Sequence, residues 1–253
     1  MPQRNSSRRL SPPGACVRFV ALGSLLAVGG LRAPAANADK DQTAAAREML
    51  ERAYSSRHYY GESFPGFEAK VTCVFGNEKT AGRVKVDSSG KTELDLPGAV
   101  PRQWVEEQLS IILSHRLRRP MGRYESLRIE EDDGHPFGRR IRADDPFETA
   151  FRIRDNRVRE IQRNAPGFRF VVSILDYTRA ADGKELPRHL AVSYFDRPSG
   201  RLLRTFVFQD SYRQVGKYAL PERRLAIGSS EQGTHTVYFE LTDHKLLPKT
   251  TDL

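Results

Sequence analysis

The sequence predicts an α+β fold that combines a largely antiparallel sheet with two principal helices. Twelve short segments alternate between apolar and polar residues, as half-buried strands do. Turn signals such as Asp182-Gly183 and Pro198-Ser199-Gly200 separate most of these segments, and short turns imply hairpins with antiparallel pairing. Two other stretches carry apolar residues at helical spacing. On these observations alone, the sheet could be either curled or sandwiched.

The first 38 residues have the features of a secretory signal peptide. Arg4, Arg8 and Arg9 make the N-terminus basic, residues 19–31 are a short apolar run, and Ala36-Asn37-Ala38 offers a small-x-small cleavage site. The apolar run is shorter than the roughly 20 residues that a membrane-spanning helix needs. We therefore expect an extracytoplasmic protein, periplasmic or secreted, that is cleaved after Ala38. Residues 39–253 would then form a single α+β domain, and both the general secretory and the twin-arginine route stay open.

Removal of the signal would change the charge of the protein. The whole chain has 41 basic and 32 acidic residues, a net charge of +9, and five of the basic residues lie in the signal. The remaining chain would have 36 basic and 32 acidic residues, a net charge of +4. Export and this modest charge argue against nucleic acid as a partner. Clusters such as Arg139-Arg140 could still contact an anionic envelope surface peripherally, although acidic residues interrupt them and favour an ordinary charged face. Cys73 would be the one cysteine left, so we expect no internal disulfide.

The first helical stretch is amphipathic. Apolar side chains recur around Ala46 and Leu50 at helical spacing, with charged residues between them. We expect Asp41 or Thr43 to cap the N-terminus of this helix, and Gly61 to close the pattern. Three short strands follow in meander order at residues 69–75, 82–86 and 92–96.

A second helix is predicted from Pro101 to about Arg118. Proline is tolerated in the first turn of a helix, acidic residues lie early, basic residues lie late, and Pro120 stops the pattern. One face carries an apolar stripe of Val105, Leu109, Ile112 and Leu113. That face should pack against the sheet.

Nine further strands complete the predicted sheet. They are residues 126–130, 139–143, 150–154, 158–163, 168–177, 189–196, 202–208, 218–227 and 235–241. Between residues 202 and 227 the pattern predicts a strand, a polar corner at Asp210-Ser211 and a second strand. Pro221 lacks a backbone donor, so an edge or a bend is expected there.

Three stretches carry a resemblance to a known family. They are Ala46-Arg47-Glu48-Met49-Leu50 with Phe64-Pro65-Gly66-Phe67, then Ile112-Leu113-Ser114-His115-Arg116, and then residues 206–221 with the ending His244-Lys245-Leu246-Leu247. In this order they resemble an uncharacterised family of exported bacterial proteins, the domain of unknown function numbered 3386. More distantly, the late portion resembles the periplasmic lipoprotein carriers, in which an incomplete barrel wraps helices and leaves an apolar cavity. We therefore predict a strongly curved sheet, an incomplete barrel, with the second helix on its concave face.

Neither resemblance supplies catalytic residues, and no catalytic motif is found in the sequence itself. The six histidines are scattered without the spacing of a metal site, so we expect no metal and no cofactor. The acidic run from Glu130 to Asp133 has consecutive oxygen donors, whereas a calcium loop alternates them. A solvated turn is therefore favoured there. His115 lies late on the second helix, where a cation packed partly on the sheet is the favoured interpretation.

The aromatic residues give the functional hypothesis. Their bulk exceeds what one seam between a helix and a sheet needs, so some could line an apolar cavity instead of filling the core. The ligand-binding candidates are Trp104, Phe168, Phe170, Phe206 and Phe208. We expect a monomer that binds or carries an apolar or amphiphilic ligand, such as a lipid, without catalysis. The alternatives are a structural or interaction module that contacts an envelope component and, third, an undetected hydrolase.

Overall fold

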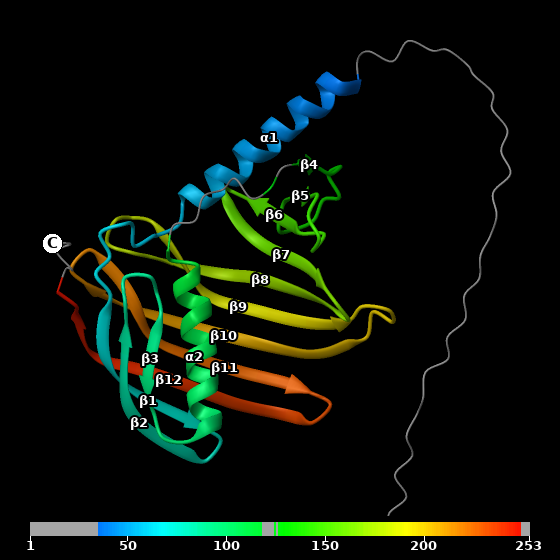
Figure 1. Ribbon diagram of the computed structural model, residues 1–253. Helices are drawn as coiled ribbons and strands as arrows, with labels where there is room; N and C mark the ends of the chain where they lie inside the picture. The colour runs from blue at the N-terminus through cyan, green and yellow to red at the C-terminus, as the bar shows by residue number, and fades with distance from the viewer. Residues whose placement is uncertain (1–34, 118–123, 125, 249–253) are drawn as a thin grey trace, which may run out of the picture. The chain divides into compact units, whose positions relative to one another are not determined.

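The computed structural model describes residues 35–117, 124 and 126–248 (Figure 1). The chain from Ala36 onward forms one compact unit. It contains helices α1 (Ala35–Ser55) and α2 (Ala99–Ser114) and a 12-stranded sheet. The strands are β1 (Phe67–Phe75), β2 (Glu78–Val86), β3 (Thr92–Asp95), β4 (Leu127–Ile129), β5 (Arg139–Ala143), β6 (Ala150–Arg154), β7 (Arg157–Ala165), β8 (Phe168–Arg179), β9 (Glu185–Asp196), β10 (Leu202–Val215), β11 (Tyr218–Ser230) and β12 (Gly233–Leu246). The α+β class is confirmed.

The sheet is antiparallel and open. Its strand order is β3-β2-β1-β12-β11-β10-β9-β8-β7-β6-β5-β4. From β4 to β12 each strand pairs with the next one in the sequence, and β12 then pairs with β1. The two edge strands, β3 and β4, are therefore consecutive in the chain, and α2 lies in the segment that joins them. The predicted incomplete barrel is confirmed, because the sheet does not close on itself.

Helix α2 lies on the concave face of the sheet, and the sheet curves around this helix (Figure 1). Its predicted stripe of Val105, Leu109, Ile112 and Leu113 is buried. The stripe belongs to one core cluster with Val71 of β1, Val84 of β2, Ala226 of β11 and Phe239 of β12. These four strands are neighbours in the sheet although β2 and β11 are far apart in the sequence, and the sheet bends around the helix that covers them.

Helix α1 packs at the other end of the sheet. Ala46, Leu50 and Ala53 are fully buried in a second cluster, which contains Ile141 of β5 and Phe151 of β6. This cluster lies on the face that carries α2, because residues directly opposite in antiparallel strands share a face. The row that connects the two clusters is Ile141, Phe151, Ile161, Val172, Val192, Phe206 and Gly228.

The twelve predicted strands are all present, and four local predictions are wrong. Helix α1 begins at Ala35, so residues 41 and 43 lie inside it and neither caps it. The same helix ends at Ser55, so Gly61 does not close it. Helix α2 ends at Ser114, where His115 forms the C-cap, and not at Arg118. Residues 210 and 211 make no turn: β10 runs on to Val215, with an irregularity between Ser211 and Tyr212, opposite Pro221.

The predicted signal peptide lies outside the described residues up to residue 34. The expected cleavage point after Ala38 falls in the first turn of α1. Neither helix in the described part of the chain combines the length and the apolar character needed to cross a membrane.

Candidate functional site

The middle of the sheet lies between the two helix-covered clusters, and its concave side chains remain half-exposed. We call this surface the concave floor. It is formed by Phe168, Phe170, Val172 and Ile174 of β8, Leu190, Val192 and Tyr194 of β9, and Phe206 and Phe208 of β10. Of these, Ile174 alone is fully buried. The floor is therefore a largely apolar surface that neither helix cluster includes as core. One charged side chain lies on it: Arg204 of β10 is opposite Tyr194, and its guanidinium lies 4.5 Å from the centre of that ring and 5.8 Å from the centre of the Phe206 ring.

The register of the strands places these side chains in rows. Val172 lies opposite Val192, which lies opposite Phe206. One row further along, Phe170 lies opposite Tyr194. Because directly opposite residues share a face, the period-two pattern that predicted the strands also puts the whole set on one side.

The aromatic rings of the floor form a contiguous series. Ring centroids are 6.3 Å apart for Phe168 and Phe170, 6.2 Å for Phe170 and Tyr194, 6.3 Å for Tyr194 and Phe206, and 5.9 Å for Phe206 and Phe208. These separations are typical of interacting aromatic pairs. The structure thus brings together four of the five residues that the sequence singled out.

Trp104 takes a different position. Its ring packs edge-on against Phe239 of β12, with centroids 5.9 Å apart, and it stays half-exposed on α2. Trp104 and Phe208 both pack against the core cluster beneath α2. The tryptophan therefore borders the covered part of the concave face, while the four phenylalanines lie on the floor itself.

A glycine in β11 shapes the end of the floor next to β12. A Cβ atom at Gly228 would lie 2.5 Å from a carbon of the His235 ring and 2.7 Å from one of the Phe206 ring. Those two rings are in edge contact, with centroids 5.9 Å apart. The missing side chain at Gly228 therefore lets both rings lie close over the backbone.

A buried ion pair lies under α2, beside the floor. The guanidinium of Arg224 donates from Nε and Nη2 to the two carboxylate oxygens of Asp210, at 2.7 Å each, and Nη1 donates to Gln108 Oε1 at 3.0 Å. Arg224 and Asp210 are both about 95% buried, with residual exposures of 5% and 4%. Asp210 was expected in an exposed polar corner, and the structure makes it part of the interior instead.

Arginines gather where the C-terminal ends of the two helices approach the sheet. The side chain of His115, the C-cap of α2, reaches solvent although protein surrounds most of it. Its pKa lies well below the usual value, first because of that surrounding protein and then because of nearby guanidinium groups. Those groups belong to Arg57, Arg116, Arg224 and Arg163. The four guanidinium groups therefore lie near enough to His115 to add to the larger effect of the surrounding protein.

Two of these arginines are deeply buried without a carboxylate partner among the described residues. Arg57 is 7% exposed and Arg116 is 3% exposed. Nε of both side chains, and Nη2 of Arg57, have no hydrogen-bond partner in the described part of the chain. Arg57 lies over the Tyr54 ring at 4.7 Å, and Arg116 donates to the Tyr212 hydroxyl at 2.9 Å. We call Arg57, Arg116 and Arg163 the cationic group.

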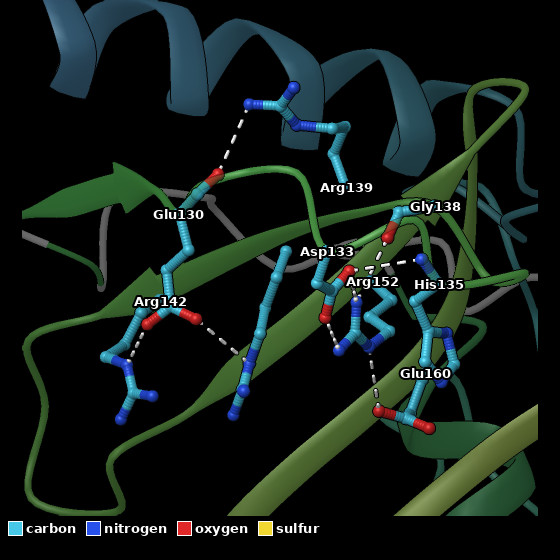
Figure 2. A network of polar contacts seen from close by, with 9 residues as sticks. Glu130, Asp133, His135, Gly138, Arg139, Arg142, Arg152 and Glu160 are labelled. Carbon is cyan, nitrogen blue, oxygen red and sulfur yellow. Dashed lines mark hydrogen bonds and ion pairs between the residues drawn. The ribbon is translucent and has the colours of Figure 1, made fainter.

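The basic residues of β5 and β6 are paired differently (Figure 2). Arg152 donates to both carboxylate oxygens of Asp133, at 2.9 and 2.6 Å, and Arg142 donates to Glu130 at 2.6 Å. These pairs hold the pKa of Asp133 and of Glu130 below the usual range. The hydrogen bond from Arg152 is the largest effect at Asp133. At Glu130 burial is the largest single effect and raises the pKa, but the hydrogen bond from Arg142 and the charges of Arg140, Arg142 and Arg128 together outweigh it. The acidic run therefore forms ion pairs within the protein, and these arginines are not a free basic surface.

Three of the histidines have separate polar partners. His58 is buried and lies 2.9 Å from Asp182, His189 lies 3.3 Å from Asp176, and His244 lies 2.8 Å from the Pro221 carbonyl oxygen. Within residues 35–117 and 126–248, no group of three His, Cys, Asp or Glu side chains could hold a metal ion.

Two hollows lie away from the floor. One has a volume of about 730 Å³ and is lined by residues of β1, β2, β3 and β12, many of them charged, such as Lys70, Arg83 and Asp95. The other, of about 410 Å³, lies where β9 and β10 diverge beyond His189, and it is lined by residues such as Leu186 and Tyr212. Neither hollow contains a predicted site residue.

Sequence reasoning missed Arg57 and gave Arg116 a minor place. Arg57 follows α1 in a polar stretch, where nothing local distinguishes it from a solvated arginine. A signal for Arg116 exists, because it continues the face of Leu109, Ile112 and Leu113. A charged residue on an apolar stripe indicates a buried charge.

The comparisons agree with the family resemblance. The model of a family described as "Protein of unknown function (DUF3386)" matches residues 41–247, which confirms the resemblance expected from the three stretches. No curated protein matches the chain.

Two solved structures have distant similarity. A LolA superfamily protein from Nitrosomonas europaea is 12% identical with a TM-score of 0.31, covering 80% of this chain and 94% of its own. A Vibrio parahaemolyticus domain, described by its name as an outer membrane lipoprotein-sorting protein, is 13% identical with a TM-score of 0.34, covering 83% and 94%. These low values carry no conclusion about function.

Proposed function

The chain belongs to the DUF3386 family of proteins of unknown function, and we propose that it binds an apolar or amphiphilic ligand on the concave floor, without catalysing a reaction. One observation carries the proposal: the apolar side chains of β8, β9 and β10 stay half-exposed between two well-packed clusters. Contiguous exposed apolar surface in a globular protein typically marks an interaction site. An exported protein would otherwise risk aggregation through it.

The chemistry of the floor favours a hydrocarbon chain. Apart from the hydroxyl of Tyr194, the side chains that form it are aliphatic or aromatic, and the guanidinium of Arg204 lies over the Tyr194 ring. Burial of one CH2 group contributes about 0.8 kcal/mol, so a chain of ten contributes about 8 kcal/mol before the cost of association. The floor thus supports binding, and it offers no nucleophile or base for catalysis.

The Phe206→Ala variant tests this proposal. Phe206 contacts the rings of both Tyr194 and Phe208 in the aromatic series, so its truncation should weaken binding of dodecanoate roughly tenfold, by analogy with the loss of part of a buried aromatic side chain. Binding is measured by isothermal titration calorimetry, with the fluorescence of Trp104, the single tryptophan, as a second signal.

Val207→Ala is the matched control. Val207 is the next residue of β10, points to the convex face and is 42% exposed. Its truncation should leave the dissociation constant unchanged. Equal effects of the two variants, or no binding by the wild-type protein, would contradict the proposal.

We further propose that the protein works outside the cytoplasm, as the basic N-terminus, the apolar run 19–31 and Ala36-Asn37-Ala38 indicate. Residues 1–38 would then be removed and residues 39–253 would act as one domain. N-terminal sequencing of the protein from the envelope fraction should give Asp39 as the first residue. An intact Met1 in the soluble cytoplasmic fraction would exclude this localisation.

A further inference from the structure

We propose that the ligand is an anionic lipid, whose headgroup carboxylate or phosphate pairs with Arg57 and Arg116 while its acyl chain lies on the concave floor. This inference rests on the proposed function and specifies the chemistry of the ligand. The proposal rests on two buried guanidinium groups, those of Arg57 and Arg116, which have no carboxylate partner among the described residues.

The burial of Arg57 and Arg116 needs an explanation. A guanidinium stays charged at any pH at which proteins fold, and a buried charge is costly unless it is paired and hydrogen-bonded. Both side chains are more than nine-tenths buried, and three of their nitrogen atoms have no partner in the described part of the chain. An anion that donates no hydrogen bonds and accepts several would satisfy these groups.

Arg224 is a buried arginine with a structural role, and its hydrogen bonds can be compared with those of Arg57. It is buried to a similar extent, and every one of its donating nitrogens meets an acceptor on Asp210 or Gln108. Among the described residues, Nε of Arg139, Arg163 and Arg169 also lacks a partner, but these side chains are less buried. Arg57 and Arg116 are the two that combine an unpartnered Nε with burial of more than nine-tenths.

Local contacts compensate the cationic group only in part. The Tyr54 ring lies under Arg57, the Tyr212 ring lies 5.3 Å from Arg116, and both arginines follow the C-terminal end of a helix. Rings and helix C-termini attract cations. Neither of them supplies an acceptor to the free Nε atoms.

The cationic group adjoins the floor. Arg163 lies on β7 directly opposite Phe170. Arg116 donates to the Tyr212 hydroxyl of β10, and Arg57 forms a β-bridge with Glu185 at the start of β9, so both reach strands that form the floor. Nε of Arg163 also lacks a partner among the described residues, while its Nη2 donates to the Tyr124 hydroxyl at 3.2 Å. An apolar surface that ends in positive charge matches a ligand with a hydrocarbon chain and an anionic end.

The experiment compares ligands of one chain length on the wild-type protein by calorimetry. Dodecanoate is the anionic probe, dodecanol the neutral probe and dodecyltrimethylammonium the cationic probe, with acetate as the headgroup alone. We expect dodecanoate to bind at least tenfold more tightly than dodecanol. We expect dodecyltrimethylammonium to bind more weakly than dodecanol, and acetate to give no measurable heat.

Variants then locate the headgroup. Arg57→Gln and Arg116→Gln should each reduce the preference for dodecanoate over dodecanol by about tenfold, and Arg57→Lys should restore part of it. Arg213→Gln is the control, because Arg213 is exposed on β10 and should leave the preference intact. Without ligand, Arg57→Gln should melt at or above the wild-type temperature, whereas loss of a structural arginine would lower it.

The outcomes separate the two proposals. Equal affinity for dodecanoate and dodecanol in the wild-type protein overturns the anionic headgroup and leaves the floor as a binding surface. Tight binding of acetate alone also overturns it, because the site would then take a free anion. Failure of all four compounds to bind overturns both proposals. The comparison of ligands needs no variant, so it holds even if Arg57→Gln fails to fold.

Discussion

Replacement of Asp210 by alanine is expected to lower the free energy of unfolding by about 3 to 5 kcal/mol, the usual cost of removing one partner from a buried ion pair. The carboxylate accepts two hydrogen bonds of 2.7 Å from Arg224, and both side chains are almost fully buried. The variant would leave a guanidinium in the interior with Gln108 as its remaining partner. Urea denaturation of wild type and variant measures the difference.

Two controls accompany this prediction. The double variant Asp210→Leu with Arg224→Met should recover most of the lost stability, because apolar residues of similar size often replace a buried pair without loss. Glu222→Ala breaks the exposed pair with Arg213 and should cost no more than about 1 kcal/mol. If Asp210→Ala is as mild as Glu222→Ala, the ion pair is not buried as described.

Truncation of Leu109 to alanine should destabilise the fold by about 2 to 5 kcal/mol, the range for a buried leucine. Leu109 is fully buried between α2 and the concave face, in one cluster with Val71 and Phe239. Glu107→Ala, on the exposed side of the same helix, should change stability by less than about 0.5 kcal/mol. Equal costs for the two variants, measured by denaturation, would mean that α2 is peripheral to the core.

Much of the fold could be predicted from local pattern. Period-two alternation and turn residues are properties of a few neighbouring residues, so they located all twelve strands, and the stripe containing Leu109 located α2. The same periodicity placed four of the five candidate residues on one face. It could not place Trp104, whose neighbour Phe239 lies 135 residues away in the sequence and is brought near by the curvature of the sheet.

The wrong predictions concern residues whose role depends on distant partners. Asp210-Ser211 has the composition of a turn, but Asp210 pairs with Arg224 in the interior and β10 continues to Val215. The N-terminus of α1 was misplaced because Asp41 and Thr43, which favour caps, also occur inside helices. The burial of Arg57 follows from the packing of both helices on the sheet, which no local pattern encodes.

Nuclear magnetic resonance of methyl groups tests the binding surface most directly. The protein offers probes on the two faces of the sheet. Val172 of β8 and Val192 of β9 lie on the floor, whereas Val207 of β10 and Ile227 of β11 are exposed on the convex face. With dodecanoate bound, intermolecular nuclear Overhauser effects should connect its methylene protons to the methyl groups of Val172 and Val192. Contacts confined to Val207 and Ile227, or none to either face, would contradict the account.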